Sequence, residues 1–338
     1  MPKVKLQDVA DYAQVSKATV SRVLNNHPTV ASSIRDRVLN AVQILDYYPD
    51  RLARRLRKGT RDVIGVVISD IQNPYFQSVI RAVEDAAYAQ QMHIVLCNTD
   101  EDTARLNTYL RLLQEENVAG LIVSVTDAEH LELLHALQQN GTPIILIDRL
   151  IEGGPMDGVR VDNVDGARQA VQHLLKLGCR RIGILYPPVI TGQERLQGYQ
   201  AALRDAGITP DERLMRVGGY RVESAYHATC ELLDDVPDAI FAANSMISLG
   251  ALRALRVRGL RIPHEVALVG FDDMPWAQDL YVPLTAVAQP TYEIGQEAVR
   301  LLLRRISDPN ADFRTVTLRT HLVVRESCGI FLQESAST

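Results

Sequence analysis

The chain has 338 residues, of which 46% are hydrophobic and 23% charged. Such a composition excludes collagenous and disordered chains, and the length suffices for two or three domains. The four cysteines form no CxxC pair, so we expect neither a zinc ribbon nor a disulfide framework. The first residues lack the apolar core of a secretory signal, and no apolar run approaches ~18 residues, so we expect a cytoplasmic protein without membrane contact.

Charge is distributed unevenly along the chain, whose net charge is −5. Residues 1–61 carry 12 Lys and Arg against 5 Asp, which gives +7, and the remaining residues carry −12. This asymmetry indicates a nucleic-acid-binding head on an acidic body.

The head starts with helical periodicity at 6–13, 18–24 and 34–45, the scale of a helix-turn-helix unit. Ser16 is placed to cap the second helix. A small apolar core is expected from Val9, Ala13, Val15, Val20 and Val23. The outer face of the second helix then carries Lys17, Ala18, Thr19, Ser21, Arg22 and Asn25.

A short helix with small, hydrogen-bonding residues at its start fits the major groove of DNA. Arg22 can make a bidentate contact with guanine, although pairing with a phosphate or an acid is the alternative. A docking role for the head toward protein is also open, but the charge of +7 favours DNA.

Residues 50–58 have helical propensity but span barely two turns, and five of the nine are cationic. We expect this segment to fold when DNA phosphates neutralise it. Two apolar residues of this segment, Leu52 and Leu56, are four residues apart and could pack on each other or on the body rather than contact DNA.

From residue 62 onward, short apolar runs alternate with segments of helical period, the pattern of βαβ units. Strands are predicted at 63–68, 93–97, 120–123, 144–147, 182–185, 239–241 and 266–271. Helices are predicted at 74–89, 102–115, 128–139, 164–177, 192–206, 222–233, 245–258 and 291–306. A break rich in Gly and Pro at 152–158 lies near the middle, so the pattern predicts two similar α/β lobes.

Polar residues follow several predicted strands, where the ligands of open α/β sheets bind. They are Asp70, Asn73, Asp100, Asp148, Arg149, Asn244, Asp272 and Asp273. Any one of them could simply cap the next helix. Motifs of nucleotide-binding, hydrolase and metalloprotease enzymes are missing, and the His residues are scattered, so we expect no enzyme, no cofactor and no metal site.

Longer motifs identify a family resemblance that covers essentially the whole chain. They are LQDVADYAQVSKATVSRVLN at 6–25, YPDRLARRL at 48–56, IGVVI at 64–68, NPYF at 73–76, RLQGY at 195–199, VGFDD at 269–273 and QP at 289–290. Together they resemble the lactose-repressor (LacI/GalR) family of bacterial transcription regulators. The implied fold is a small all-α helix-turn-helix head (1–48), a hinge helix and linker (49–61), and a periplasmic-binding-protein-like body of two doubly wound parallel-sheet lobes (62–338).

The resemblance also implies the DNA contacts. In this family the hinge helix enters the minor groove, where an apolar side chain, here Leu56, wedges a base step open. The implied contact residues are Ser16, Lys17, Ala18, Thr19, Ser21, Arg22, Asn25, Arg51, Ala53, Arg54, Leu56 and Arg57. One departure is Ala31, where the family places a Ser or Thr cap, so we expect Ser32 to cap the third helix or its start to fray.

The effector pocket carries over in the same way. The implied residues are Asn73, Tyr75, Phe76, Asp100, Asp148, Arg149, Arg195, Tyr220, Asn244, Asp272 and Gln289. The pair Asp148 and Arg149 looks like that of ribose-type binders and favours a neutral sugar, whereas purine-sensing relatives carry an arginine where this chain has Val189. Tyr75 and Phe76 could instead be core residues, and Arg195 could be a structural ion-pair residue.

These features predict a homodimeric repressor that binds a palindromic operator, because one short helix reads too few base pairs. A sugar-like effector would control the affinity for DNA through its differential affinity for two states. The tail 325–338 has no leucine heptads, so a tetramerising coiled coil is not expected. The rivals are a nucleobase-responsive or phosphate-ligand-responsive regulator, a solute-binding protein, and a Rossmann-like enzyme.

Overall fold

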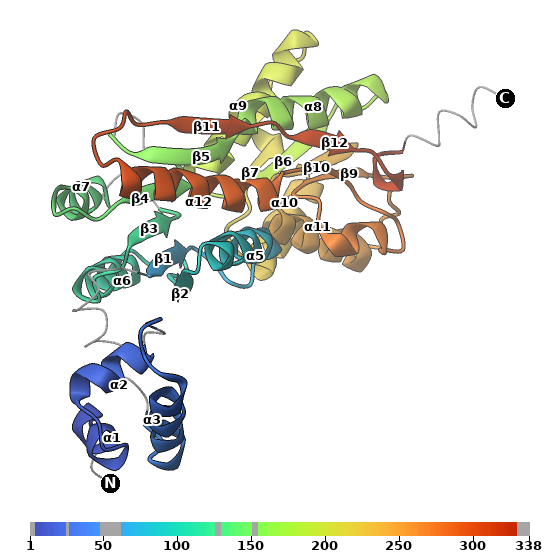
Figure 1. Ribbon diagram of the computed structural model, residues 1–338. Helices are drawn as coiled ribbons and strands as arrows, with labels where there is room; N and C mark the ends of the chain where they lie inside the picture. The colour runs from blue at the N-terminus through green and yellow to red at the C-terminus, as the bar shows by residue number, and fades with distance from the viewer. Residues whose placement is uncertain (1–3, 25–26, 48–61, 126–129, 151–154, 330–338) are drawn as a thin grey trace. The chain divides into compact units, whose positions relative to one another are not determined.

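The computed structural model describes residues 4–24, 27–47, 62–125, 130–150 and 155–329. The chain forms two compact units, Met1–Arg61 and Asp62–Thr338 (Figure 1). The predicted hinge helix and Asn25 lie outside the described residues. Among the helices that are described, none combines the length and the apolar character needed to span a membrane.

The head contains three helices, α1 (Leu6–Tyr12), α2 (Lys17–Leu24) and α3 (Ser32–Ile44). The apolar residues predicted for its core are confirmed, with Val15 partly buried at the edge. Ser16 Oγ accepts a hydrogen bond from Thr19 N at 3.1 Å, which confirms the predicted cap of α2. Ala31 occupies the capping position of α3 and offers no side-chain bond. The expectation that Ser32 caps this helix is wrong, because Ser32 is already its first helical residue.

The first lobe of the body is built on six parallel strands in the order β11-β5-β4-β3-β1-β2. They are β1 (Val63–Ile68), β2 (His93–Asn98), β3 (Gly120–Val123), β4 (Ile144–Ile147), β5 (Asp157–Val161) and β11 (Thr315–Leu318). Helices α5 (Pro74–Ala89) and α12 (Thr291–Ser307) pack on one face. Helices α6 (Thr103–Glu115) and α7 (Leu131–Gln139) pack on the other, so the central Val and Ile runs are buried on both sides.

The second lobe repeats this plan in the order β12-β10-β9-β8-β6-β7, with only β12 antiparallel to its neighbour. Its strands are β6 (Ile182–Tyr186), β7 (Met215–Val217), β8 (Ala239–Ala242), β9 (Ala267–Phe271), β10 (Thr285–Ala288) and β12 (His321–Val323). Helices α8 (Asn163–Lys176) and α9 (Ile190–Asp205) cover one face, and α10 (Val222–Leu233) and α11 (Ser245–Val257) the other. Short 3₁₀ turns lie at Glu212–Leu214, Pro275–Gln278 and Glu326–Cys328.

All seven predicted strands are confirmed, but the lobe boundary is not at the predicted break. Strand β5 overlaps that break and still belongs to the first sheet, so the chain crosses to the second lobe only after it. The chain returns through α12 to β11 and crosses again to β12 (Figure 1). The polar residues Asp157 and Arg160 interrupt the apolar pattern of β5, which explains why the sequence did not reveal this strand.

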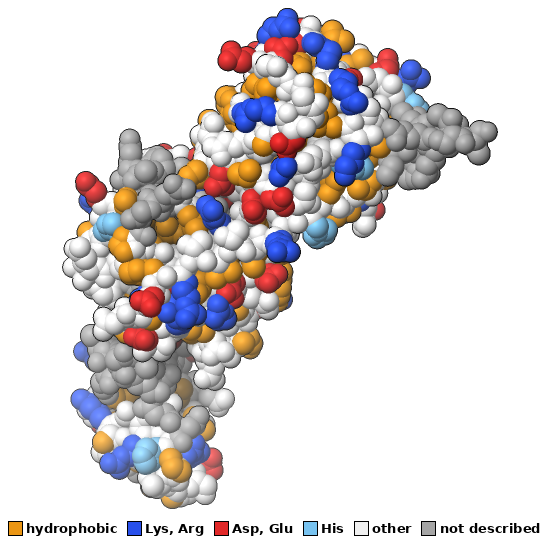
Figure 2. Space-filling view, turned by 90° about the horizontal axis from the view of Figure 1, so that it is seen from above, with side chains coloured by type: hydrophobic (Ala, Val, Ile, Leu, Met, Phe, Trp, Pro, Cys, Tyr) orange, Lys and Arg blue, Asp and Glu red, His pale blue; other side chains and the backbone are white. Residues whose placement is uncertain are grey.

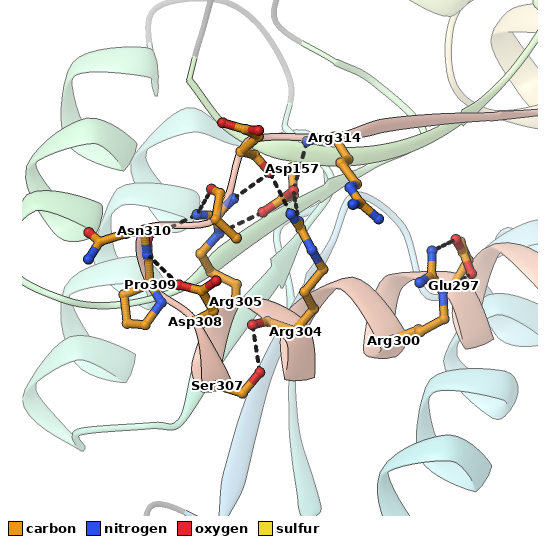
Figure 3. A network of polar contacts seen from close by, with 12 residues as sticks. Asp157, Glu297, Arg300, Arg304, Arg305, Ser307, Asp308, Pro309, Asn310 and Arg314 are labelled. Carbon is orange, nitrogen blue, oxygen red and sulfur yellow. Dashed lines mark hydrogen bonds and ion pairs between the residues drawn. The ribbon is translucent and has the colours of Figure 1, made fainter.

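A buried ionic network fastens the returning segment to the first sheet (Figure 3). Asp157, at the start of β5, is fully buried and accepts bonds from Arg305 Nε at 2.8 Å and Arg314 N at 2.9 Å. Arg305 also donates to the carbonyl oxygens of Pro309 and Ala311. One carboxylate therefore joins β5, the end of α12 and the approach to β11.

Candidate functional site

A cavity opens at the carboxyl ends of the strands of both sheets. Residues that follow β1, β2 and β4 supply one side, and residues that follow β6, β7, β8, β9 and β10 supply the other. The lining residues are Asp70, Asn73, Tyr75, Phe76, Glu101, Asp148, Arg149, Pro187, Val189, Thr191, Arg195, Tyr220, Asn244, Asp272 and Gln289. This is the place where open α/β sheets bind ligands.

The structure brings ten of the eleven predicted effector residues to this cavity, and Asp100 is the exception. The Asp100 side chain accepts bonds from Arg105 at 2.5 Å and from Asn98 at 2.9 Å, outside the cavity lining. Those contacts lower its pKa, the bond from Asn98 most. Glu101 lines the cavity in its place. Sequence analysis also missed Pro187 and Thr191 as lining residues, and their only signal was a position shortly after a predicted strand.

Capping and lining are not alternatives for the two asparagines. Asn73 Oδ1 accepts from Tyr75 N at 3.0 Å and so caps α5, and it also accepts from Ser245 Oγ at 3.2 Å. Asn244 Oδ1 caps α11 through Ile247 N at 2.7 Å. Both side chains line the cavity as well, and the helix caps hold them in place.

Aromatic rings contribute in two ways. Tyr75 and Phe76 are almost fully buried, pack edge to face at 5.0 Å between ring centroids, and belong to the core of the first lobe while they also line the cavity. Tyr220 is 37% exposed and presents a ring on the opposite side. An apolar sugar face or a planar base can stack on such a ring.

Arg195 is a buried cation held by neutral groups. Its Nε donates to Asn163 Oδ1 at 2.9 Å, its Nη1 donates to the Ala243 carbonyl oxygen at 2.5 Å, and the guanidinium lies 3.7 Å from the centroid of the Phe271 ring. These contacts fix the planar group in the cavity wall, where its charge attracts oxygen atoms.

Arg149 and Glu101 form a bidentate pair, with Nη2 to Oε1 at 2.6 Å and Nη1 to Oε2 at 2.7 Å. Burial lowers the pKa of Arg149, but the bonds and the charge of Glu101 outweigh this effect and raise the pKa above its ordinary value. Burial raises the pKa of Asp148 to about 6, and the nearby carboxylates of Asp272 and Glu101 add to the rise, while Arg149 and Arg195 oppose it.

Three of these carboxylates sit on unusual backbone. Glu101, Asp148 and Asp272 have φ values of +62°, +66° and +75°, in the left-handed region that non-glycine residues rarely occupy. Asp272 is then placed to accept from Ser245 N at 3.1 Å and from Gln289 Nε2 at 2.5 Å. Strained backbone of this kind is often concentrated at functional sites.

The head presents the residues predicted to contact DNA. Ser16, Lys17, Ala18 and Arg22 are exposed at the start and on the outer side of α2, and Thr19 and Ser21 are half-buried. Arg51, Ala53, Arg54, Leu56 and Arg57 lie outside the described residues, as Asn25 does. The face of the body seen in Figure 2 differs in character, because basic and acidic side chains are interspersed over it.

Comparison with known proteins gives the family. The ribose operon repressor of Halalkalibacterium halodurans is 35% identical to this chain. The match covers 95% of this chain and 96% of that repressor. The chain belongs to the lacI family of bacterial regulatory proteins. Residues 5–50 of this lacI-family regulator match the family described as bacterial regulatory proteins, lacI family. Residues 171–328 match the periplasmic binding protein-like domain. It is therefore a DNA-binding transcriptional regulator of the repressor type.

Solved structures of relatives match this lacI-family regulator along nearly its whole length. The Lac repressor dimer bound to operator and an anti-inducer has a TM-score of 0.85 at 29% identity, with 96% of this chain and 99% of that chain covered. A complex of the regulator CelR with cellobiose has a TM-score of 0.73 at 34% identity, with 96% and 100% covered. The fold class inferred from sequence, a helix-turn-helix head on a two-lobed body, is confirmed.

Proposed function

We propose that this regulator is a repressor whose affinity for its operator is controlled by a neutral sugar or sugar derivative bound in the cavity. The observation that carries this proposal is a pair of buried polar atoms in the wall, Arg149 Nε and Gln289 Oε1, which have no hydrogen-bond partner in the described part of the chain. One is a donor and the other an acceptor, and a sugar hydroxyl can both accept and donate. Leaving such atoms unpaired costs about 1–3 kcal/mol each, which a bound hydroxyl would recover.

The remaining lining fits the same ligand class. The residues proposed to bind it are Asn73, Tyr75, Phe76, Asp148, Arg149, Arg195, Tyr220, Asn244, Asp272 and Gln289. Carboxylates and amides bind vicinal hydroxyls, and Tyr220 offers a ring for the apolar face. One relative is named a ribose operon repressor and another was solved in complex with cellobiose, and both names support a sugar as the effector. Val189 provides no cation for a purine.

The first experiment is a thermal-shift screen with ribose, glucose, galactose, cellobiose, hypoxanthine and guanine. A neutral sugar should raise the unfolding midpoint, because binding to the native state alone adds about 2.7 kcal/mol at a hundredfold excess over Kd. Arg149→Ala should lose that response, whereas Arg168→Ala, which breaks an exposed pair with Asp205, should keep it. A shift from a nucleobase alone would overturn the sugar assignment.

For DNA, we propose that two copies of the chain bind a palindrome, with Lys17, Thr19 and Arg22 among the groove contacts and Leu56 as the wedge. Against an operator selected by the wild-type protein from random duplexes, Arg22→Ala should lose about 1–3 kcal/mol and relax specificity at one base pair. Arg37→Ala removes the same charge from the exposed side of α3 and should leave specificity unchanged. Leu56→Ala should weaken operator binding far more than binding to unrelated duplex. Equal losses would contradict the wedge.

A further inference from the structure

In the cavity wall, the Glu101 carboxylate accepts a hydrogen bond from each of the two terminal nitrogens of Arg149. The two bonds measure 2.6 and 2.7 Å, and the side chains are only 12% and 7% exposed. Arg149 Nη1 also lies 3.4 Å from the Val125 carbonyl oxygen. The edge of the guanidinium that would grip a phosphate or carboxylate of a ligand is therefore already bound to an anion of the protein.

Glu101 reaches this position through a specific local conformation. Asp100 and Glu101 have consecutive φ values of +55° and +62°, which reverse the chain just after β2. Glu101 N donates to the Ser69 carbonyl oxygen at 3.2 Å, and this bond anchors the turn to the end of β1. Asp100 thereby faces Arg105 on the outside while Glu101 faces the cavity. Two neighbouring non-glycine residues bear a conformational cost to orient one carboxylate inward.

The other charges of the cavity wall also disfavour an anionic ligand. Asp70, Asp148 and Asp272 place three more carboxylates around the cavity. The second cation, Arg195, has Nε and Nη1 bound to Asn163 and Ala243. An anionic ligand would therefore meet carboxylates that repel it, and the two terminal nitrogens of Arg149 are already bound to Glu101.

We propose that Glu101 sets the charge specificity of the cavity: by holding Arg149, it makes the site accept uncharged polyols and reject phosphorylated or carboxylated sugars. This inference rests on the proposed function in taking the cavity as the effector site. Glu101 acts through Arg149 and is in that sense a positioning residue. The Nε of Arg149, 3.4 Å from Asp148 Oδ2 and without a hydrogen bond, remains for a ligand hydroxyl.

The test compares wild-type protein with Glu101→Gln, which keeps the shape of the side chain and removes its charge. Binding is measured by calorimetry for matched pairs, ribose with ribose 5-phosphate and glucose with glucose 6-phosphate, and by the thermal response to inorganic phosphate against chloride at equal ionic strength. Wild type should prefer the neutral member and ignore phosphate. Glu101→Gln should shift the preference toward the phosphorylated member at least tenfold and gain a response to phosphate.

Two further variants separate charge selectivity from a structural effect. Glu101→Asp keeps the carboxylate and should keep the rejection of phosphate. Glu265→Gln alters an exposed pair in which Glu265 accepts two bonds from Arg261, and it should behave as wild type. A general loss of stability would lower affinity for both members of a pair and leave their ratio unchanged.

Three results would overturn the proposal: an unchanged ratio in Glu101→Gln, a Glu101→Asp variant that binds phosphate, or a wild-type protein that prefers the phosphorylated sugar. The last needs no variant and decides the matter even if Glu101→Gln does not fold. If wild type responds to no neutral sugar, the proposed function fails. The phosphate comparison then still decides the role of Glu101, since a gained response supports it and no gain overturns it.

Discussion

Ser245 Oγ donates a hydrogen bond of 3.2 Å to Asn73 Oδ1 and so connects the two lobes beside the cavity. Ser245 begins α11 of the second lobe, and Asn73 caps α5 of the first. Ser245 is 1% exposed, and its backbone N–H also bonds Asp272. Two helix starts and one strand end therefore meet where a ligand would bind.

Ser245→Ala should lower the free energy of unfolding of the body by about 1 kcal/mol, because it removes one buried hydrogen bond. It should also lower affinity for any sugar that the screen identifies, since Asn73 loses a partner that orients it. The control is Ser307→Ala, which removes a bond from an exposed hydroxyl to the Arg304 carbonyl oxygen in the first lobe alone. Denaturant titration and calorimetry measure both effects, and equal changes in the two variants would contradict a special role for Ser245.

Asp148 should make the stability of the body depend on pH. Its pKa of about 6 lies above the ordinary 3.8, so the folded state holds the proton more tightly than the unfolded state between these values. The free energy of unfolding contributed by this group therefore falls as the pH rises from about 4 to about 6, by about 3 kcal/mol at most. Asp148→Asn should gain stability relative to wild type across that range.

The opposite sign is expected for Asp100→Asn. The pKa of Asp100 is lowered, so its ionised form stabilises the fold, and the variant should lose stability relative to wild type as the pH rises through the acid range. Urea titrations between pH 4 and pH 7 measure the difference for Asp148→Asn, and titrations that extend below pH 4 measure the difference for Asp100→Asn. Parallel behaviour of the two variants would contradict the assignment of a raised pKa to Asp148.

Asp157→Ala should destabilise the first lobe strongly, by about 3–5 kcal/mol, because it leaves the buried Arg305 guanidinium without its anion. Glu297 provides the control, since its partner Arg300 lies on α12 as Arg305 does (Figure 3), but Arg300 is exposed and Glu297 is only half-buried. Glu297→Ala should cost less than about 1 kcal/mol. Thermal unfolding of both variants decides the point, and similar losses would refute the importance of burial.

Ala31→Ser should stabilise the head. The backbone at Ala31 is extended and places residue 31 at the capping position of α3, but alanine has no oxygen to offer. A serine there should add about 0.5–1.5 kcal/mol to the free energy of unfolding of the head. Ala31→Val changes size without adding an acceptor and should give no gain, and amide exchange in the first turn of α3 reports both.

Much of the fold was predictable from sequence because local patterns determine it. The runs 63–68 and 144–147 are buried on both faces and carry little but Val, Ile and Leu, so they were recognised with correct bounds. Strand β11 was not, because its sequence Thr-Val-Thr-Leu has a weak pattern and its partner, β5, is more than 150 residues earlier in the chain. The assignment of β11 to the first sheet depends on this distant pairing.

The site was predictable to the same extent and for a related reason. Residues such as Asn73 and Asp272 directly follow strands, so their position at the sheet edge follows from the topology. The side of the chain to which Asp100 and Glu101 turn depends instead on two left-handed backbone angles, which residue types do not reveal. The sequence therefore predicted a cavity carboxylate in the correct turn after β2, but it indicated Asp100 where the structure has Glu101.

The return of α12 to the first lobe also has a consequence for synthesis. Gly295 of α12 lies so close to α5 that a side chain there would meet the Val79 carbonyl oxygen, and Ile294 and Ala298 share a core with Val79 and Val83. The first lobe is translated early, yet this apolar face stays uncovered until α12 and β11 emerge about 150 residues later. At bacterial rates of roughly 5–20 residues per second, that interval lasts about 10–30 s. The nascent chain thus keeps this apolar surface uncovered while nearly half of its residues are still being added.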